Sequence, residues 1–84
     1  MKKHDLKTLP EYFWAVIEKR KPFEVRKNDR KFKVGDVLVL REWTEKKGYT
    51  GRAVMRTVSY ILDDPEYCKE GYVVLGFKTE DNQK

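Results

Sequence analysis

Hydrophobic and polar positions follow two different patterns along the chain. Alternation of apolar and polar residues, or a short apolar run, occupies residues 1–7, 23–26, 37–43, 49–62 and 71–77, and each of these patterns is typical of a β-strand. Helical spacing is confined to about residues 9–19, where Leu9, Phe13, Val16 and Ile17 share one stripe and Ala15 falls outside it. The pattern predicts one helix and about five strands.

The predicted helix has a start signal and a stop signal. Thr8 is the expected N-cap, because Glu11 follows at the spacing of a capping box and Pro10 lies in the first turn. Pro22 ends the helix, since a proline disfavours helical conformation in the residue before it. Trp14, at the margin of the apolar stripe, is expected to pack under a neighbouring loop, and exposure as a stacking surface is the alternative.

The short strand 23–26 has the sequence FEVR. Because side chains alternate across a strand, Phe23 and Val25 are expected to face the core and Glu24 and Arg26 to lie side by side on the other face. Four consecutive aliphatic residues at 37–40 indicate a strand covered on both sides. These features favour an α+β fold: a small, partly closed β-barrel of about five strands, with the N-terminal helix packed across one opening.

Length and composition limit the classes of protein that the chain can represent. Its 84 residues suit a single domain over 1–84, and the polar tail 79–84 is expected to be frayed. The one cysteine, Cys68, is expected to be unreactive, and the sequence calls for no metal and no cofactor. Without a cationic leader or an apolar run near 20 residues, we expect a cytoplasmic protein that does not enter a membrane.

Positive charge is concentrated in one segment. The formal net charge is +5, and residues 19–33 hold eight lysines and arginines against two acids, Glu24 and Asp29. The rest of the chain is therefore close to neutral. A local excess of this size favours a polyanionic partner such as nucleic acid.

The segment 19–26 resembles the signature of the ASCH domains, a PUA-like family, which is usually written GxKxxExR. Lys21, Glu24 and Arg26 match it, whereas Lys19 stands in place of the glycine. The segments His4-x-Leu6-Lys7, Arg26–Arg30, Gly35-Asp36 and Tyr49-Thr50-Gly51 extend the resemblance, to a compact bacterial and phage-type subfamily, over nearly the whole chain. The resemblance implies a PUA-like β-barrel with a cleft beside the signature, and a role in binding RNA or a nucleotide-like ligand.

The resemblance places Lys21, Glu24 and Arg26 in that cleft. Arg26 would offer phosphate a planar fork, Lys21 would supply a mobile charge, and Glu24 would orient Arg26 or accept a hydrogen bond from a base. The alternative is that Glu24 and Arg26 form an ordinary ion pair on an exposed strand face. Further candidates for ligand contact are Lys7, Lys27, Asn28, Arg30 and Tyr49.

Some of these candidates have a structural explanation as well. His4 either lines the cleft with Lys7 or ends a strand in solvent. Tyr49 and Trp43 either stack on bases or pack against each other across strands. The side chain of Asn28 is equally well explained by turn formation.

Three functions remain open from the sequence. The first is binding of RNA or a nucleotide-like ligand through a basic cleft. The second is hydrolysis of an acylated cytidine, with Lys21 and Glu24 as catalytic residues; Glu24 occupies the threonine position of ASCH amidohydrolases, and their glutamate has no clear match, Glu66 and Glu70 being nearby. The third is interaction with an acidic protein. The oligomeric state is left undetermined.

Overall fold

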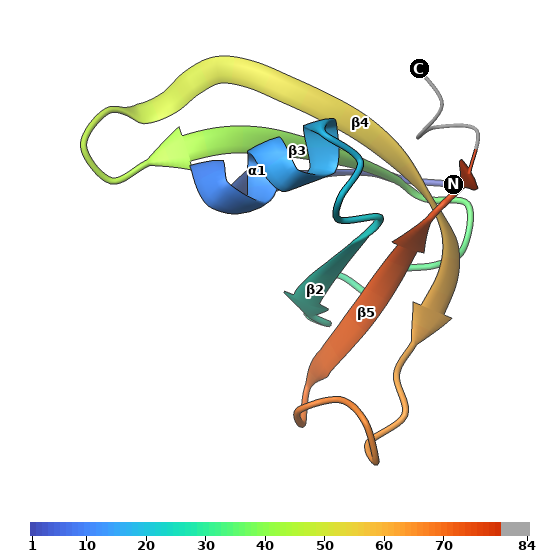
Figure 1. Cartoon of the computed structure of the whole chain (residues 1–84). Helices are drawn as coiled ribbons and strands as arrows, with labels where there is room; N and C mark the ends of the chain where they lie inside the picture. Colours follow the sequence, from blue (N-terminus) through green and yellow to red (C-terminus); the bar gives the residue numbers. More distant parts are fainter. Residues whose placement is uncertain (80–84) are drawn as a thin grey trace.

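The computed structural model describes residues 1–79 and has an α+β fold (Figure 1). The elements in chain order are β1 (Lys3–Thr8), α1 (Pro10–Ile17), β2 (Phe23–Lys27), β3 (Val37–Thr44), β4 (Gly48–Leu62) and β5 (Tyr72–Phe77). The one helix and five strands predicted from the sequence are therefore confirmed. The tail that was expected to fray lies, apart from Thr79, outside the described residues.

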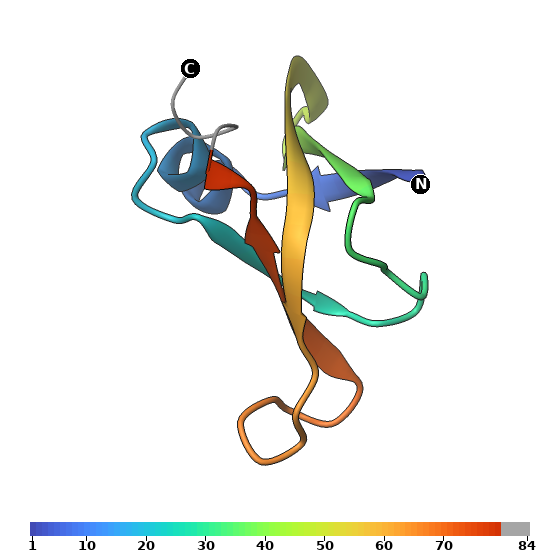
Figure 2. The same cartoon turned by 90° about the vertical axis from the view of Figure 1, so that its right-hand side faces the viewer.

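The five strands form one mixed sheet in the order β1-β3-β4-β5-β2. β1 pairs with β3 in parallel, and the other neighbours are antiparallel. The long strand β4 joins two halves, because its residues 48–57 pair with β3 and its residues 58–62 with β5 (Figure 2). The two edge strands are β1 and β2, and no backbone pairing joins them within residues 1–79. The sheet is therefore open between β1 and β2.

The core lies on the inner face of the curved sheet. Alternation along β1 points His4, Leu6 and Thr8 inward. In β3 the inward residues Leu38 and Leu40 are fully buried, whereas Val37 and Val39 are only half-buried, so this strand is not covered equally on both sides. Side chains from β4 and β5 and from the segment before β3 complete the core: Phe32, Val58, Val73, Leu75 and Phe77.

The helix α1 packs against β3 (Figure 1), and its buried side chains are Phe13, Ala15 and Val16. Burial of Ala15 extends the contact beyond the predicted stripe, and Leu9 of that stripe is exposed. Trp14 is neither free nor fully covered: its ring stays partly exposed while its Nε1 donates a hydrogen bond to Glu42 Oε2 at 2.9 Å. Within residues 1–79, no helix has enough length and apolar character to cross a membrane.

Both predicted ends of α1 are corrected. The N-cap is Leu9, which makes no side-chain capping bond. Thr8 is instead the last residue of β1, where its hydroxyl donates to the Leu6 carbonyl at 3.1 Å. At the other end the helix stops at Ile17, because Lys19 adopts a left-handed conformation with φ 63°. The amides of Lys19 and Arg20 then donate to carbonyls of the last turn, which forms a Schellman cap.

The predicted orientation of β2 is wrong. Glu24 is buried on the inner face, while Phe23 and Val25 are exposed. Residues paired across a sheet share a face, and the partner of Glu24 on β5 is the fully buried Leu75. The apolar residues of this edge strand therefore face outward, because cationic partners allow the carboxylate to be buried.

Candidate functional site

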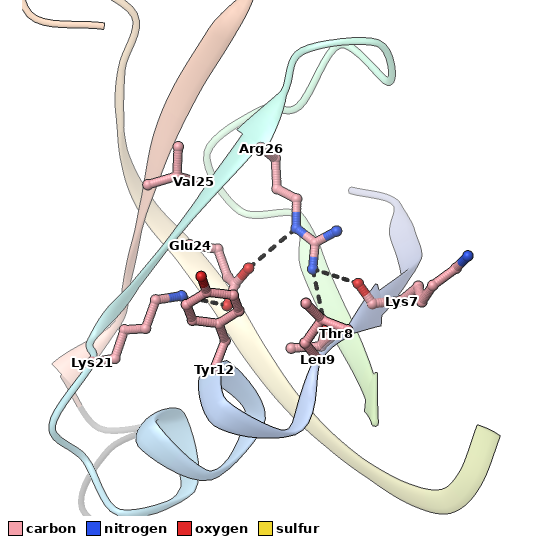
Figure 3. A pocket seen from close by; sticks show the side chains of 8 residues that line it. All are labelled: Lys7, Thr8, Leu9, Tyr12, Lys21, Glu24, Val25 and Arg26. Atoms are coloured by element: carbon pink, nitrogen blue, oxygen red, sulfur yellow. Dashed lines mark hydrogen bonds and ion pairs between the residues drawn. The ribbon is translucent and has the colours of Figure 1, made fainter. Parts of the chain in front are cut away.

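A pocket of about 420 Å³ lies at the open edge of the sheet, where the end of β1, the start of α1 and β2 meet (Figure 3). This volume lies within the range of small-molecule sites, roughly 300–1,000 Å³. Eight residues line it: Lys7, Thr8, Leu9, Tyr12, Lys21, Glu24, Val25 and Arg26. The pocket therefore includes the three signature residues and Lys7.

The floor of the pocket is an ion-pair cluster centred on Glu24. Only 3% of Glu24 is exposed. Its Oε2 accepts from Lys21 Nζ at 2.7 Å and its Oε1 accepts from Arg26 Nε at 3.1 Å. Burial of a carboxylate is unfavourable unless the charge is paired and hydrogen-bonded. Because both oxygens have cationic donors, Glu24 is held in one orientation, and the cluster has a net charge of +1.

Arg26 links the two edge strands. Its Nη2 donates to the Lys7 carbonyl at 3.0 Å and to Thr8 Oγ1 at 3.1 Å, so a side chain of β2 bridges to the end of β1 (Figure 3). The guanidinium fork that the sequence predicted for phosphate therefore already makes three hydrogen bonds within the protein. Within residues 1–79, only Nη1 of this guanidinium takes part in no hydrogen bond. Lys21 is likewise paired with Glu24 and is not a mobile charge.

The walls of the pocket are apolar and accessible. Leu9 and Tyr12 are exposed residues beside the charged floor, and Val25 borders the pocket from the outward face of β2. Lys21 Nζ lies 5.3 Å from the centroid of the Tyr12 ring. Sequence reasoning missed all three residues and Thr8 as components of the site. The position of Tyr12 beside the helical stripe was the one available signal, because an aromatic residue just outside a buried stripe remains accessible.

The other predicted ligand-contacting residues do not line this pocket. Lys27 and Arg30 are exposed at the end of β2 and in the following loop. Asn28 Oδ1 accepts from the Phe32 amide at 3.4 Å, which agrees with turn formation. Tyr49 lies on β4 with the Arg41 guanidinium carbon 4.1 Å from its ring centroid.

The basic segment 19–33 is less uniform than its composition indicates. Lys21 and Arg26 are paired with Glu24, and the exposed Arg20 is paired with Glu18. The remaining cations of the segment are exposed: Lys19, Lys27, Arg30, Lys31 and Lys33. The segment therefore provides both the paired cluster of the pocket and unburied positive charge around β2.

His4 matches neither of the predicted alternatives. It is buried, its Nε2 lies 2.8 Å from Asp36 Oδ2, and its ring packs edge-on against Phe32 with centroids 4.7 Å apart. Burial raises the pKa of Asp36, but the hydrogen bonds from His4 and from the amides of Lys2 and Lys33 outweigh it and hold the pKa below its usual value. This pair fixes the start of β1 to the residue before β3.

A second buried glutamate, Glu42, lies on β3. Its Oε1 accepts from Thr50 Oγ1 at 2.8 Å and from Arg52 Nη1 at 3.1 Å, and its Oε2 accepts from Trp14. Burial raises the pKa of Glu42, whereas these three hydrogen bonds and the Arg52 charge lower it, and the net direction is downward. Glu42 therefore ties α1 to the β3–β4 hairpin.

Residues 1–79 contain no group of three or more histidine, cysteine, aspartate or glutamate residues placed to hold a metal ion. Cys68 is half-buried in the loop after β4, where its Sγ donates to the Leu62 carbonyl at 3.3 Å. The groups available in the pocket are the ion pairs of Glu24, the hydroxyls of Thr8 and Tyr12, and apolar surfaces.

Comparison with known proteins finds a relative and a family model that each match most of the chain. It is similar to the "Uncharacterized 12.9 kDa protein in GpA 3'region" of Escherichia phage P2, with 38% identity over 72 residues. The match covers 86% of this chain and 64% of the phage protein, so the chain spans slightly less than two thirds of that relative. A family model described as "Domain of unknown function (DUF3850)" matches residues 3–77. Because this match covers nearly the whole described chain, the protein belongs to the DUF3850 family.

Proposed function

We propose that the pocket binds one nucleotide of an RNA, with the base against the apolar walls and the phosphate on the cationic side. The observation that carries this proposal is the combination of exposed Leu9, Tyr12 and Val25 with the Lys21–Glu24–Arg26 cluster in one pocket. Sites for small ligands have mostly apolar walls and a few placed polar groups. A nucleotide offers the same combination, because it has a planar apolar face, polar base edges and an anion.

The proposed base contacts are stacking and edge recognition. Tyr12 presents an accessible ring, and stacking of one base on an aromatic side chain is worth about 1–3 kcal/mol. Glu24 has acceptor capacity beyond the two bonds that it makes, so it can accept from an exocyclic amino group. Arg26 Nη1 supplies a donor for a base carbonyl or a phosphate oxygen.

The proposed phosphate contacts use charge beyond the paired cluster. Lys7 borders the pocket with its ammonium group toward the outer face of the sheet, and the exposed Lys27 follows Arg26 on β2. If four or five cations meet phosphate, log affinity for a single strand falls with log salt at a slope of about −0.7 per contact. Titration of a short RNA at several salt concentrations measures this slope. Binding without salt dependence, or tighter binding of polyglutamate, would contradict the proposal and in the second case favour an acidic protein partner.

Titration with each of the four ribonucleoside monophosphates tests the pocket itself, with binding detected by changes in backbone amide chemical shifts. We expect shifts around Tyr12, Lys21 and Arg26 for at least one monophosphate, and their loss in Tyr12→Ala. Tyr67→Ala is the matched control, because Tyr67 is an exposed tyrosine in the loop between β4 and β5. Absence of shifts at the pocket with all four, or unchanged shifts in Tyr12→Ala, would contradict nucleotide binding there.

We also propose that the chain is related to the ASCH domains that its signature resembles. The contacts among Lys21, Glu24 and Arg26 and the left-handed Lys19 at the signature's glycine position support this. The open sheet then corresponds to a PUA-like barrel that lacks backbone pairing between β1 and β2. Superposition of an experimental structure on an ASCH domain tests the relationship, and a different strand order would contradict it.

A second candidate is hydrolysis of an acylated cytidine. The observation that favours it is that the pocket contains a lysine, a threonine and a glutamate: Lys21, Thr8 and Glu24. Against it, Thr8 is 2% exposed and its hydroxyl already binds Leu6 and Arg26. Incubation with N4-acetylcytidine, with Lys21→Ala as the comparison, tests the activity; absence of released cytidine leaves binding as the function.

A further inference from the structure

Lys7 belongs to two surfaces at once. Its carbonyl accepts from Arg26 Nη2 in the pocket, while its Nζ lies 4.2 Å from the centroid of the Trp43 ring on β3. Figure 3 shows the Lys7 side chain directed away from the cluster of Lys21 and Glu24. The pocket is therefore continuous, through one residue, with the outer face of the sheet.

That outer face carries a cluster that we call the outer aromatic patch: Lys7, Arg41, Trp43 and Tyr49. Lys7 is paired with Arg41 between β1 and β3, and Trp43 is paired with Tyr49 between β3 and β4. Glu42, between Arg41 and Trp43 on β3, is buried on the inner face, so the four side chains share the outer face. Tyr49 is 49% exposed, so its ring is accessible from this side.

Each ring of the outer aromatic patch is paired with a cation. Lys7 lies over Trp43, and the Arg41 guanidinium lies over Tyr49 at 4.1 Å. Bases of single strands stack on aromatic rings and on guanidinium planes, and the adjacent phosphates are attracted by the same cations. A duplex conceals its base faces, and an acidic protein requires the charges but not the rings. Asp5, the preceding outward residue of β1, bounds the patch on one side.

We infer that a single-stranded RNA runs from the pocket across Lys7 and places a neighbouring base on Tyr49 and Arg41. The inference rests on the proposed nucleotide pocket and extends it, because the ligand then has several nucleotides and two contact surfaces. Charge complementarity supports it, since Lys7 and Arg41 give the patch two positive charges and no acid within it. RNA is the occupant that we assign, because single-stranded loops and ends are the usual targets of RNA recognition.

The experiment measures fluorescence anisotropy of a labelled single-stranded RNA of about eight nucleotides, within the usual site size of roughly 4–16. Tyr49→Ala is expected to weaken binding of this RNA roughly 5- to 100-fold, the equivalent of one stacked base. Binding of a monophosphate in the pocket is expected to be unchanged in the same variant. Arg41→Gln is expected to make the salt slope shallower by about 0.7, and Tyr67→Ala is the exposed tyrosine control.

The outcomes separate this inference from the proposed pocket. Unchanged RNA affinity in Tyr49→Ala, with loss in Tyr12→Ala, overturns the second surface and leaves the pocket intact. Loss of monophosphate binding in Tyr49→Ala overturns it too, because the effect is then transmitted through the fold. Equal or tighter binding of single-stranded DNA overturns RNA as the occupant. Failure of every monophosphate to bind the pocket, by contrast, overturns the proposed function.

Discussion

Two buried glutamates, Glu24 and Glu42, are held in different ways. They are 3% and 4% exposed, respectively. Glu24 is held by the cations Lys21 and Arg26, which line a pocket. Glu42 is held by the neutral donors of Trp14 and Thr50 and by one cation, Arg52.

The difference distinguishes a candidate site from a structural tie. Around Glu42 the charges of the acid and Arg52 cancel, and the donors connect α1 to the β3–β4 hairpin. Around Glu24 one positive charge remains, and exposed apolar side chains surround the cluster. Burial of an acid by itself therefore does not indicate a binding site. The Glu24 cluster is a candidate site because it combines surplus charge with accessible apolar surface, and that combination is suited to an amphipathic anion.

The largest expected effect is on stability, when the arginine paired with each buried glutamate is removed. Arg26→Ala leaves the buried Glu24 with Lys21 alone and removes the bridge from β2 to β1, so we expect a loss of about 2–3 kcal/mol in unfolding free energy and a melting temperature lower by roughly 10–20 °C. Arg52 is 59% exposed in its side chain, and Glu42 keeps two other donors. Arg52→Ala is therefore expected to lower the melting temperature by less than about 5 °C.

Thermal unfolding by circular dichroism of both variants measures the contrast. The double variant Glu24→Gln/Arg26→Ala is the control, because it removes the buried charge that Arg26→Ala leaves poorly paired. It should be more stable than Arg26→Ala alone. Equal losses in Arg26→Ala and Arg52→Ala would show that the two glutamates are held equivalently and would remove the comparison.

An effect of intermediate size is expected on the stability of the fold at acidic pH. The hydrogen bonds to Glu42 and Asp36 hold their folded-state pKa values below the ordinary 4.5 and 3.8. Each ionised group therefore contributes stability that is fully present above its ordinary value and is lost as pH falls through the lowered folded value. The melting temperature should fall progressively below about pH 4.5.

Melting curves at a series of pH values test this dependence. Glu42→Gln should be less stable than the wild type at neutral pH, and its melting temperature should change less on acidification. Asp36→Asn, at the other end of β3, should behave in the same way. A Glu42→Gln variant that keeps the full acid dependence of the wild type would be inconsistent with a lowered pKa.

The smallest effect concerns the backbone that leads to the Glu24 cluster. Lys19, two residues before Lys21, adopts a left-handed conformation with φ 63°. Within residues 1–79 the non-glycine residues with positive φ are Lys19 and Lys31, so the residues around Glu42 have no such strain. The left-handed region costs an L-residue roughly 1–2 kcal/mol, and glycine avoids this. Lys19→Gly is therefore expected to raise the unfolding free energy by about 0.5–1 kcal/mol in urea denaturation. Lys19→Ala is the control, because it removes the same charge without relieving the backbone; an equal gain there would attribute the effect to charge.

Sequence patterns predicted the elements better than their orientation. Period-two alternation holds in β1, where His4 and Leu6 share the inward face. The same reasoning failed for β2, because FEVR alternates equally well with either face inside. At this sheet edge the pairing of Glu24 with Leu75 and the cations at 21 and 26 decided which face is buried.

The candidate site likewise contains residues that the sequence predicted and residues that it did not. The resemblance to the ASCH signature placed Lys21, Glu24 and Arg26 together, and strand alternation alone placed Glu24 beside Arg26, as observed. Thr8, Leu9 and Tyr12 come from segments about 15 residues earlier in the chain, and local periodicity contains no information about contacts over that distance. Their place in the pocket depends on how the open edge brings β1 and α1 next to β2.

The sequence by itself determined one helix, five strands and a basic segment, because these follow from periodicity, turn residues and charge over a few positions. The tertiary structure decided that the sheet is open between β1 and β2, that Arg26 bridges the two edges, and that His4 is buried against Asp36. Those features depend on which distant groups satisfy a buried charge. That choice is made by packing of the whole chain and not by the neighbours of each residue.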